Sequence, residues 1–268
     1  MNKTFRHISS AVLGIVVFLF WWLFYPYALS FQEQNQLFLF TWDYFSERIS
    51  LSGGLADYIA EFITQFSYIP YLGEALLAVV FVIFQKAIAL SIDRDEWYVL
   101  SFVAPVMMLV YMSDIYVMLS YLVALIAAVR LCAFYRRHPG IIWAGIATVL
   151  GYWLIGPAIF VFTLFAVIRE RNSKSLILIA LSVIVVVASR LTYLQQYPWK
   201  TVIFGINYYR LPITVPAIQL IIAGVTALIP VFSDLLPKPR RILDISLGLL
   251  ILTGGIAGCW LNYEKDVV

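Results

Sequence analysis

The chain has 268 residues, of which 63% are hydrophobic and 12% are charged, and its mean hydropathy is +0.91. Soluble domains carry about 25% charged residues, and a water-soluble core could not hide this much apolar surface. The composition therefore predicts an integral membrane protein. The net charge of +3 is too small to indicate nucleic-acid binding. Cys132 and Cys259 lie far apart in the sequence, which indicates neither a zinc motif nor a disulfide.

The chain is predicted to be an all-α, polytopic transmembrane helix bundle that forms a single transmembrane domain over residues 1–268. A span needs about 20 apolar residues at about 1.5 Å per residue. The first is interpreted as a retained anchor, because no small-residue cleavage site follows it. Gly156-Pro157 separates the short fifth and sixth spans, which could instead form one kinked hairpin inside the bundle. The nine predicted spans are 8–29, 70–90, 97–113, 115–134, 140–156, 157–169, 175–190, 213–232 and 242–262.

The distribution of basic residues predicts the orientation of these spans. Lys and Arg are enriched on the cytoplasmic side of membrane proteins. With nine spans and the N-terminus inside, the clusters Arg136-Arg137, Arg169-Glu170-Arg171 and Lys238-Pro239-Arg240-Arg241 all fall on the inner side. We therefore expect the N-terminus inside and the C-terminus outside.

The first outer loop, 31–70, is long, acidic and aromatic. It holds Arg48 as its only base. Two surface helices are predicted, over 32–48 and 55–66, with a break at 50–54. The second has apolar residues three and four positions apart, which is typical of a helix lying flat on a membrane or bundle. The carboxylates of the loop are Glu33, Asp43, Glu47, Asp57 and Glu61.

Glu33 follows the first predicted span and is flanked by amide side chains. A carboxylate at a membrane exit, among groups that suit hydroxyl ligands, is a candidate general base. The alternative is a solvated helix start. Asp114, between the third and fourth spans, could meet Glu33 across a shared cavity. Its alternative or additional role is to cap the fourth span.

Other charged residues have weaker indications. Arg190, Lys200 and Arg210 are outer bases that could hold a phosphate, or in the case of Arg190 extend along the span to reach the interface. The pairs Asp43/Glu47 and Asp57/Glu61 each lie one helical turn apart and could bind a cation, although a solvated helix face is the favoured interpretation. No phosphate-binding loop, nucleophile elbow or metal motif is present in the sequence.

The segments 29–38 and 52–66 resemble an uncharacterised family of bacterial multi-pass membrane proteins, which implies the bacterial inner membrane. The layout is also similar to the GT-C class of membrane glycosyltransferases, which use polyprenyl-phosphate sugars. In that class one span leads into a long outer loop that begins with a carboxylate and contains two surface helices. The class usually has an aspartate where this chain has Gln32-Glu33-Gln34. It commonly carries a soluble C-terminal domain, which is expected to be missing from this sequence.

The resemblance to the GT-C class implies roles for individual residues. Glu33 would match the loop carboxylate that acts as a base, and Asp114 a second acidic position. The donor-phosphate contacts would be Arg190, Lys200 or Arg210. The implied partners are membrane lipid and a polyprenyl-phosphate sugar, and no cofactor or metal is assigned. The alternative is a non-catalytic membrane scaffold or transporter-like module.

Overall fold

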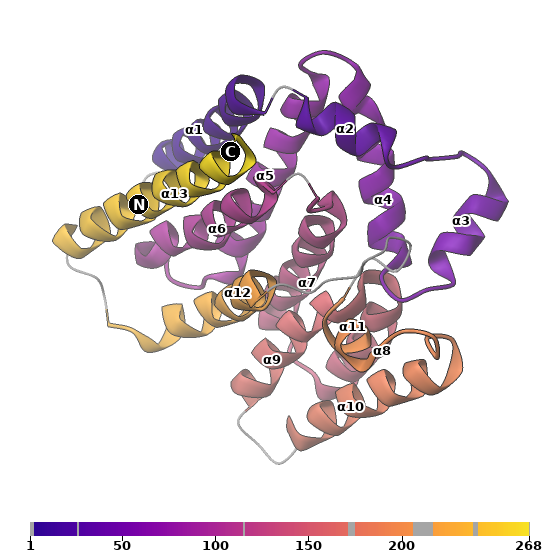
Figure 1. Cartoon of the computed structure of the whole chain (residues 1–268). Coiled ribbons are helices and arrows are strands. Elements are labelled where there is room, and N and C mark those ends of the chain that lie inside the picture. Colours follow the sequence, from indigo (N-terminus) through magenta and orange to yellow (C-terminus); the bar gives the residue numbers. More distant parts are fainter. Residues whose placement is uncertain are drawn as a thin grey trace.

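The computed structural model describes residues 3–25, 27–114, 116–170, 175–205, 217–237 and 241–267. Every regular element among them is a helix, so the predicted all-α class is confirmed (Figure 1). The elements are α1 (Lys3–Phe24), α2 (Ala28–Gln34), α3 (Trp42–Ile49), α4 (Gly54–Thr64), η1 (Gln65–Tyr68), α5 (Leu72–Ser91), η2 (Asp95–Phe102), α6 (Val103–Met112), α7 (Leu119–Arg137), α8 (Ile141–Ile155), η3 (Gly156–Ala158), α9 (Ile159–Glu170), α10 (Ser175–Thr192), α11 (Trp199–Phe204), α12 (Ala217–Leu235) and α13 (Arg241–Val267).

Seven helical stretches of the described residues are long and apolar enough to cross a membrane. The first predicted span was placed too far along the chain, since α1 ends at Phe24 and α2 starts separately at Ala28. The other predicted spans each overlap helices of the described residues, and residues 213–216 of the span predicted over 213–232 lie outside the described residues. That nine segments cross the bilayer stays a prediction. The seven stretches are α1, α5, Asp95–Met112, α7, Ile141–Glu170, α10 and α12, and α13 holds a shorter apolar stretch, Ser246–Leu261.

The stretch Ile141–Glu170 is folded back on itself at Gly156-Pro157. The hydroxyl oxygens of Thr148 on α8 and Thr163 on α9 are 3.0 Å apart. In one straight helix their Cα atoms would be separated by about 22 Å along the axis. The side chain of Ile159 also packs so closely on Gly151 that a Cβ there would lie 2.4 Å from it. The two helices therefore form an antiparallel hairpin, the alternative that the glycine-proline turn had indicated.

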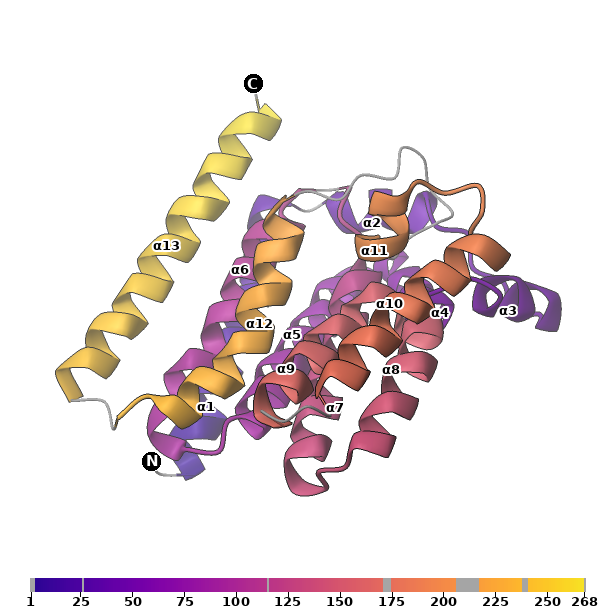
Figure 2. The same cartoon turned by 90° about the horizontal axis from the view of Figure 1, so that it is seen from below.

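Figure 2 shows that most long helices run between two ends of the molecule, which we call upper and lower as drawn there. The upper end carries α2 and α11, and the N-terminus lies at the lower end. Polar contacts tie the lower end together. Asp234 of α12 forms ion pairs with Arg136 of α7 (2.8 Å) and with Arg169 of α9 (3.6 Å). Arg94 donates to the carbonyl of Leu236 (2.7 Å). The ends of α7, α9 and α12 therefore share one side of the bundle.

Helix α7 lies at the centre of the bundle and contacts α4, α5, α8 and α9. Its residues Leu122, Leu125 and Val129 are completely buried. They are spaced three and four positions apart, so they form one face of the helix. This central helix connects the lower end with the site described below.

Candidate functional site

The predicted outer loop consists of α2, α3, α4 and η1, which we call the loop layer; Figure 2 shows α2 at the upper end and α3 and α4 lower, beside the bundle. The prediction of one helix over 32–48 was wrong, because residues 35–41 separate α2 from α3. Side chains take over the hydrogen bonds of this non-helical stretch. Gln65 donates to the carbonyl of Gln36 (2.6 Å), and the Tyr44 hydroxyl lies 2.6 Å from the carbonyl of Leu37. Thr41 caps α3 by accepting from the Tyr44 amide.

The break between α3 and α4 is confirmed, and it anchors the loop layer to the bundle. Gly53 has a φ of 83°, which glycine adopts without strain. A Cβ on Gly54 would lie 1.8 Å from the carbonyl oxygen of Arg48, so the chain turns too tightly for any other residue. Ser52 donates to the carbonyl of Tyr152 (2.6 Å), and the Gly53 amide donates to that of Trp153 (2.8 Å). The layer is thus hydrogen-bonded to the end of α8.

Helix α4 confirms the helix predicted over 55–66, but it buries the face that carries its carboxylates. Asp57 and Glu61 are 2% and 8% exposed, and Ala60 between them is completely buried. Ile59, which belongs to the apolar stripe, is 40% exposed. The interpretation of Asp57 and Glu61 as a solvated face was therefore wrong. Helix α4 packs on α7, and the rings of its apolar stripe are partly covered by the preceding segment, since Tyr58 and Phe62 pack on Phe38 at 4.9 and 5.6 Å.

Glu61 belongs to a buried ion pair that joins α3 to α4. Arg48 donates from Nε to Glu61 Oε2 (3.0 Å) and from a terminal nitrogen to the Tyr44 hydroxyl (2.9 Å). Tyr44 in turn lies 2.6 Å from the same carboxylate oxygen. Burial and the hydrogen bond to Glu61 raise the pKa of Tyr44 above its ordinary range. Burial alone would lower the pKa of Arg48, but the charge of Glu61 raises it. The contact between α3 and α4 therefore explains why these charged and polar side chains are buried.

Glu33 lies on α2, where that helix packs on the loop between α6 and α7. Gln32 donates to the carbonyl of Val117 (3.0 Å), and the rings of Phe31 and Tyr116 meet edge to face at 6.1 Å. Glu33 is half-buried, and its side chain has no hydrogen bond or ion pair with the described residues. Its carboxylate is therefore available to a ligand.

Asp114 comes from the loop that α2 contacts, so the two predicted carboxylates lie in neighbouring segments. Asp114 is exposed, and its Oδ1 accepts from the amide of Tyr116 (3.0 Å). It does not cap α7, whose N-cap is Met118. The expected capping role was wrong because Asp114 stabilises a turn that ends before the helix begins. A cavity shared by Glu33 and Asp114 stays a prediction.

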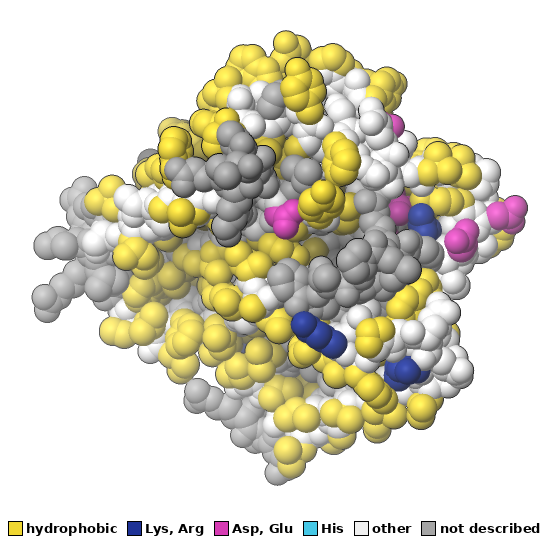
Figure 3. Space-filling view, in the orientation of Figure 1, with side chains coloured by type: hydrophobic (Ala, Val, Ile, Leu, Met, Phe, Trp, Pro, Cys, Tyr) yellow, Lys and Arg dark blue, Asp and Glu magenta, His cyan; other side chains and the backbone are white. Residues whose placement is uncertain are grey.

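Two of the three predicted phosphate contacts, Arg190 and Lys200, are described, and they lie at the end of α10 and on α11. The guanidinium of Arg190 stacks over the ring of Trp199 at 5.7 Å. Its Nε is buried and has no hydrogen-bond partner among the described residues. Lys200 is exposed on α11, and Arg210 lies outside the described residues. Figure 3, which views the upper end, shows basic side chains near α10 and α11, and both signs of charge over α3.

Sequence reasoning missed the burial of Asp57, Glu61 and Tyr44. One signal was present, since Arg48 is the only base among the acidic residues of the loop and so was a candidate partner for a buried carboxylate. Among the described residues, no group of three or more His, Cys, Asp and Glu side chains is arranged to hold a metal ion.

Comparison with known proteins gives a family for the chain. The sequence model of a family of unknown function, DUF6057, matches residues 2–265. No curated protein and no solved structure matches the chain.

Proposed function

We propose a function from the site itself, because the chain belongs to DUF6057, a family without an established activity. The proposal is a membrane glycosyltransferase of GT-C type. It would move a sugar from a polyprenyl-phosphate donor to an acceptor hydroxyl at the upper end of the bundle, which the distribution of basic residues predicts to lie outside the cell. The observation that supports it best is Glu33, a half-buried carboxylate without a described partner, one helix after the first span.

In the proposed reaction Glu33 takes the proton of the acceptor hydroxyl. The hydroxyl oxygen then forms a bond to the anomeric carbon of the sugar. The bond between that carbon and the phosphate oxygen breaks, and its electron pair leaves with the polyprenyl phosphate. Arg190 and Lys200 would stabilise the negative charge of this leaving group. The Asp114 oxygen that is not engaged by Tyr116 can accept a second hydroxyl of the acceptor.

The test uses the full chain in liposomes with radiolabelled polyprenyl-phosphate hexoses and a mixture of hydroxyl acceptors. We expect chain-dependent transfer of label, and Glu33→Gln should lower its rate about 100-fold or more, because proton abstraction contributes about that much. Asp43→Asn is the matched control, since Asp43 is an exposed carboxylate of the same layer, and it should leave the rate unchanged. Transfer by Glu33→Gln at the wild-type rate would remove the proposed base.

A non-catalytic scaffold is the second candidate, and one observation favours it. The loop layer exposes large hydrophobic side chains, among them Phe40 and Trp42 at 78% and 75% exposure. Exposed apolar patches of this kind mark contacts with lipid or protein. Absence of transfer from every donor, together with co-purification of one stoichiometric protein through this surface, would favour the scaffold.

A further inference from the structure

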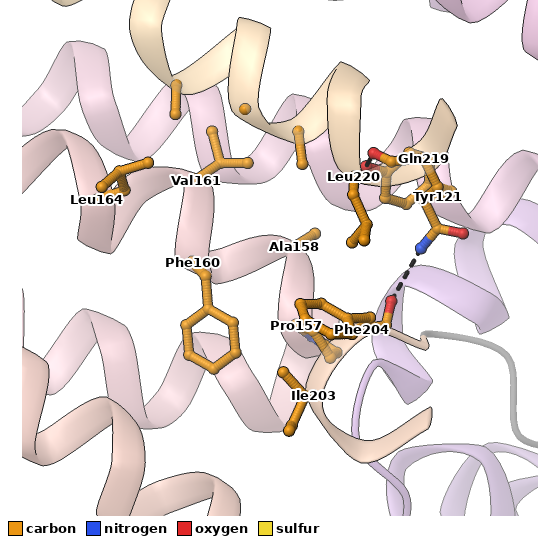
Figure 4. Close-up of a pocket in the computed structure, with 13 residues that line it drawn as sticks. Tyr121, Pro157, Ala158, Phe160, Val161, Leu164, Ile203, Phe204, Gln219 and Leu220 are labelled. Carbon is orange, nitrogen blue, oxygen red and sulfur yellow. Dashed lines mark hydrogen bonds between the residues drawn. The ribbon is translucent and has the colours of Figure 1, made fainter. Parts of the chain in front are cut away.

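A cavity of about 240 Å³ lies between α9 and α12, and Glu33 does not line it. Figure 4 shows Val161 and Leu164 of α9 on one side and Leu220 of α12 on the other. Apart from Gln219 and the hydroxyl of Tyr121, its lining side chains are apolar. The volume is below the roughly 300–1,000 Å³ of sites for whole drug-sized ligands, so it suits a segment of a chain.

The cavity is a slot that runs along the two helices. Its lining extends from Leu220 to Ala227 on α12 and from Pro157 to Leu164 across from it. Seven residues of helix correspond to about 10 Å. Gly224 leaves the middle of the slot open, because a Cβ built there meets nothing within 4 Å. Leu220 is 38% and Leu164 41% exposed, which leaves the slot open on the surface that a bilayer would cover.

The upper end of the slot is polar, which gives a ligand a direction. Tyr121 donates to the carbonyl of Gln219 (2.7 Å), and Gln219 donates to the carbonyl of Phe204 (2.9 Å) (Figure 4). An apolar chain in the slot would therefore point toward the lower end, and a polar group attached to it would lie toward α11.

Helix α11 connects this slot to Arg190 and Lys200, the two predicted phosphate contacts that lie among the described residues. Ile203 and Phe204 line the slot from its last turn. Residues four positions apart lie on one face of a helix. Trp199, on which Arg190 stacks, thus lies one turn before Ile203, and Lys200 lies one turn before Phe204. The two cations form no ion pair among the described residues, so they leave positive charge one helical turn from an apolar slot.

We infer that the slot binds the first segment of the hydrocarbon chain of a lipid phosphate, with its phosphate at Arg190 and Lys200. Hydrocarbon is the material that a bilayer supplies to an apolar opening, and the unpaired cations select an anionic headgroup. Only the choice of a polyprenyl phosphate rests on the proposed function. The apolar slot and the two cations near it are observed independently of that function.

The test is photolabelling of the full chain in phosphatidylcholine vesicles. The probe is a polyprenyl phosphate with a diazirine in its first isoprene units, and labelled peptides are identified by mass spectrometry. We expect label in α9 and α12, and Gly224→Leu should reduce it at least tenfold by filling the slot. Gly254→Leu is the matched control, because Gly254 also meets nothing within 4 Å but lies on α13, and it should keep the label within twofold.

Two further arms of the experiment test the role of the headgroup and provide a result that does not depend on the folding of any variant. Arg190→Gln with Lys200→Gln should reduce labelling by the phosphate probe at least fivefold and leave labelling by the uncharged polyprenol probe unchanged. In the wild-type chain, excess unlabelled polyprenyl phosphate should compete and phosphatidylcholine should not. Absence of that competition would overturn the inference without any variant, as would equal labelling of Gly224→Leu or label spread over α1 and α10.

The same experiment keeps the slot and the proposed function distinguishable. Glu33→Gln should label like the wild type, because Glu33 does not line the slot. Label in α9 and α12 without any sugar transfer would reject the enzyme and keep the lipid site. Sugar transfer that Gly224→Leu leaves unchanged, with no specific label, would reject the lipid site and keep the enzyme.

Discussion

At the scale of single residues, the loop layer contains an ion pair, Arg48 and Glu61, that is largely removed from water. The side chains of Arg48 and Glu61 are 13% and 10% exposed. Two charges in such a place stabilise each other, but either alone is costly. The pair therefore makes the position of α3 on α4 specific, whatever its net contribution to stability.

Replacing one partner of this pair should destabilise the protein strongly. We expect Arg48→Met to lower the free energy of unfolding by about 3–5 kcal/mol, since it leaves Glu61 buried without its cation. The measurement is the midpoint of thermal unfolding in detergent micelles. The double variant Arg48→Met with Glu61→Leu should recover most of the loss, because no buried charge remains. A double variant as unstable as the single one would show that the pair is not the cause.

At the scale of elements, the hairpin of α8 and α9 makes the sharpest geometric statement. In a variant without native cysteines, Thr148→Cys with Thr163→Cys should form a disulfide under mild oxidation, because the two hydroxyl oxygens are 3.0 Å apart. Thr148→Cys with Thr253→Cys is the control, since Thr253 is exposed on α13, and it should stay reduced. The shift on a non-reducing gel after proteolysis reports the bond. Failure of the first pair to cross-link would favour one continuous helix.

The sequence was sufficient for the long apolar helices and insufficient for the loop layer. Hydrocarbon requires an uninterrupted apolar stretch, so elements such as α5 and α10 are visible in composition alone. Helix α4 has an equally clear apolar stripe, but periodicity does not say which face meets the bundle. The split of α2 from α3 depends on hydrogen bonds from Gln65 and Tyr44, which are made only in the folded chain. For the same reason, the position of Glu33 could be predicted but its surroundings could not.

At the scale of the whole molecule, the ion pairs at the lower end bring together segments that the distribution of basic residues had assigned to one side. The grouping does not by itself say which side faces the cytoplasm. The basic clusters predict that the lower end does, and therefore that the loop layer and α11 face outward.

This orientation can be tested with single cysteines in a variant without native ones. Asp43 is exposed on α3 in the loop layer, and Arg137 is exposed at the end of α7. In intact spheroplasts, a membrane-impermeant maleimide should label Asp43→Cys. It should label Arg137→Cys only after permeabilisation, because that site is predicted to face the cytoplasm. The reverse pattern would invert the predicted topology and place the proposed reaction inside the cell.

The hydrogen bond from Ser52 to the carbonyl of Tyr152 spans 100 positions of the chain, which has a consequence for biogenesis. Ribosomes add about 5–20 residues per second, so roughly 5–20 s pass between translation of the two residues. Through most of that interval α4 has no complete α7 on which to pack, since α7 ends at Arg137, and α8 is nearly complete only at its close. Packing of this region is thus a late event, and nascent chains halted before α7 would leave Asp57 and Glu61 without the helix on which α4 packs.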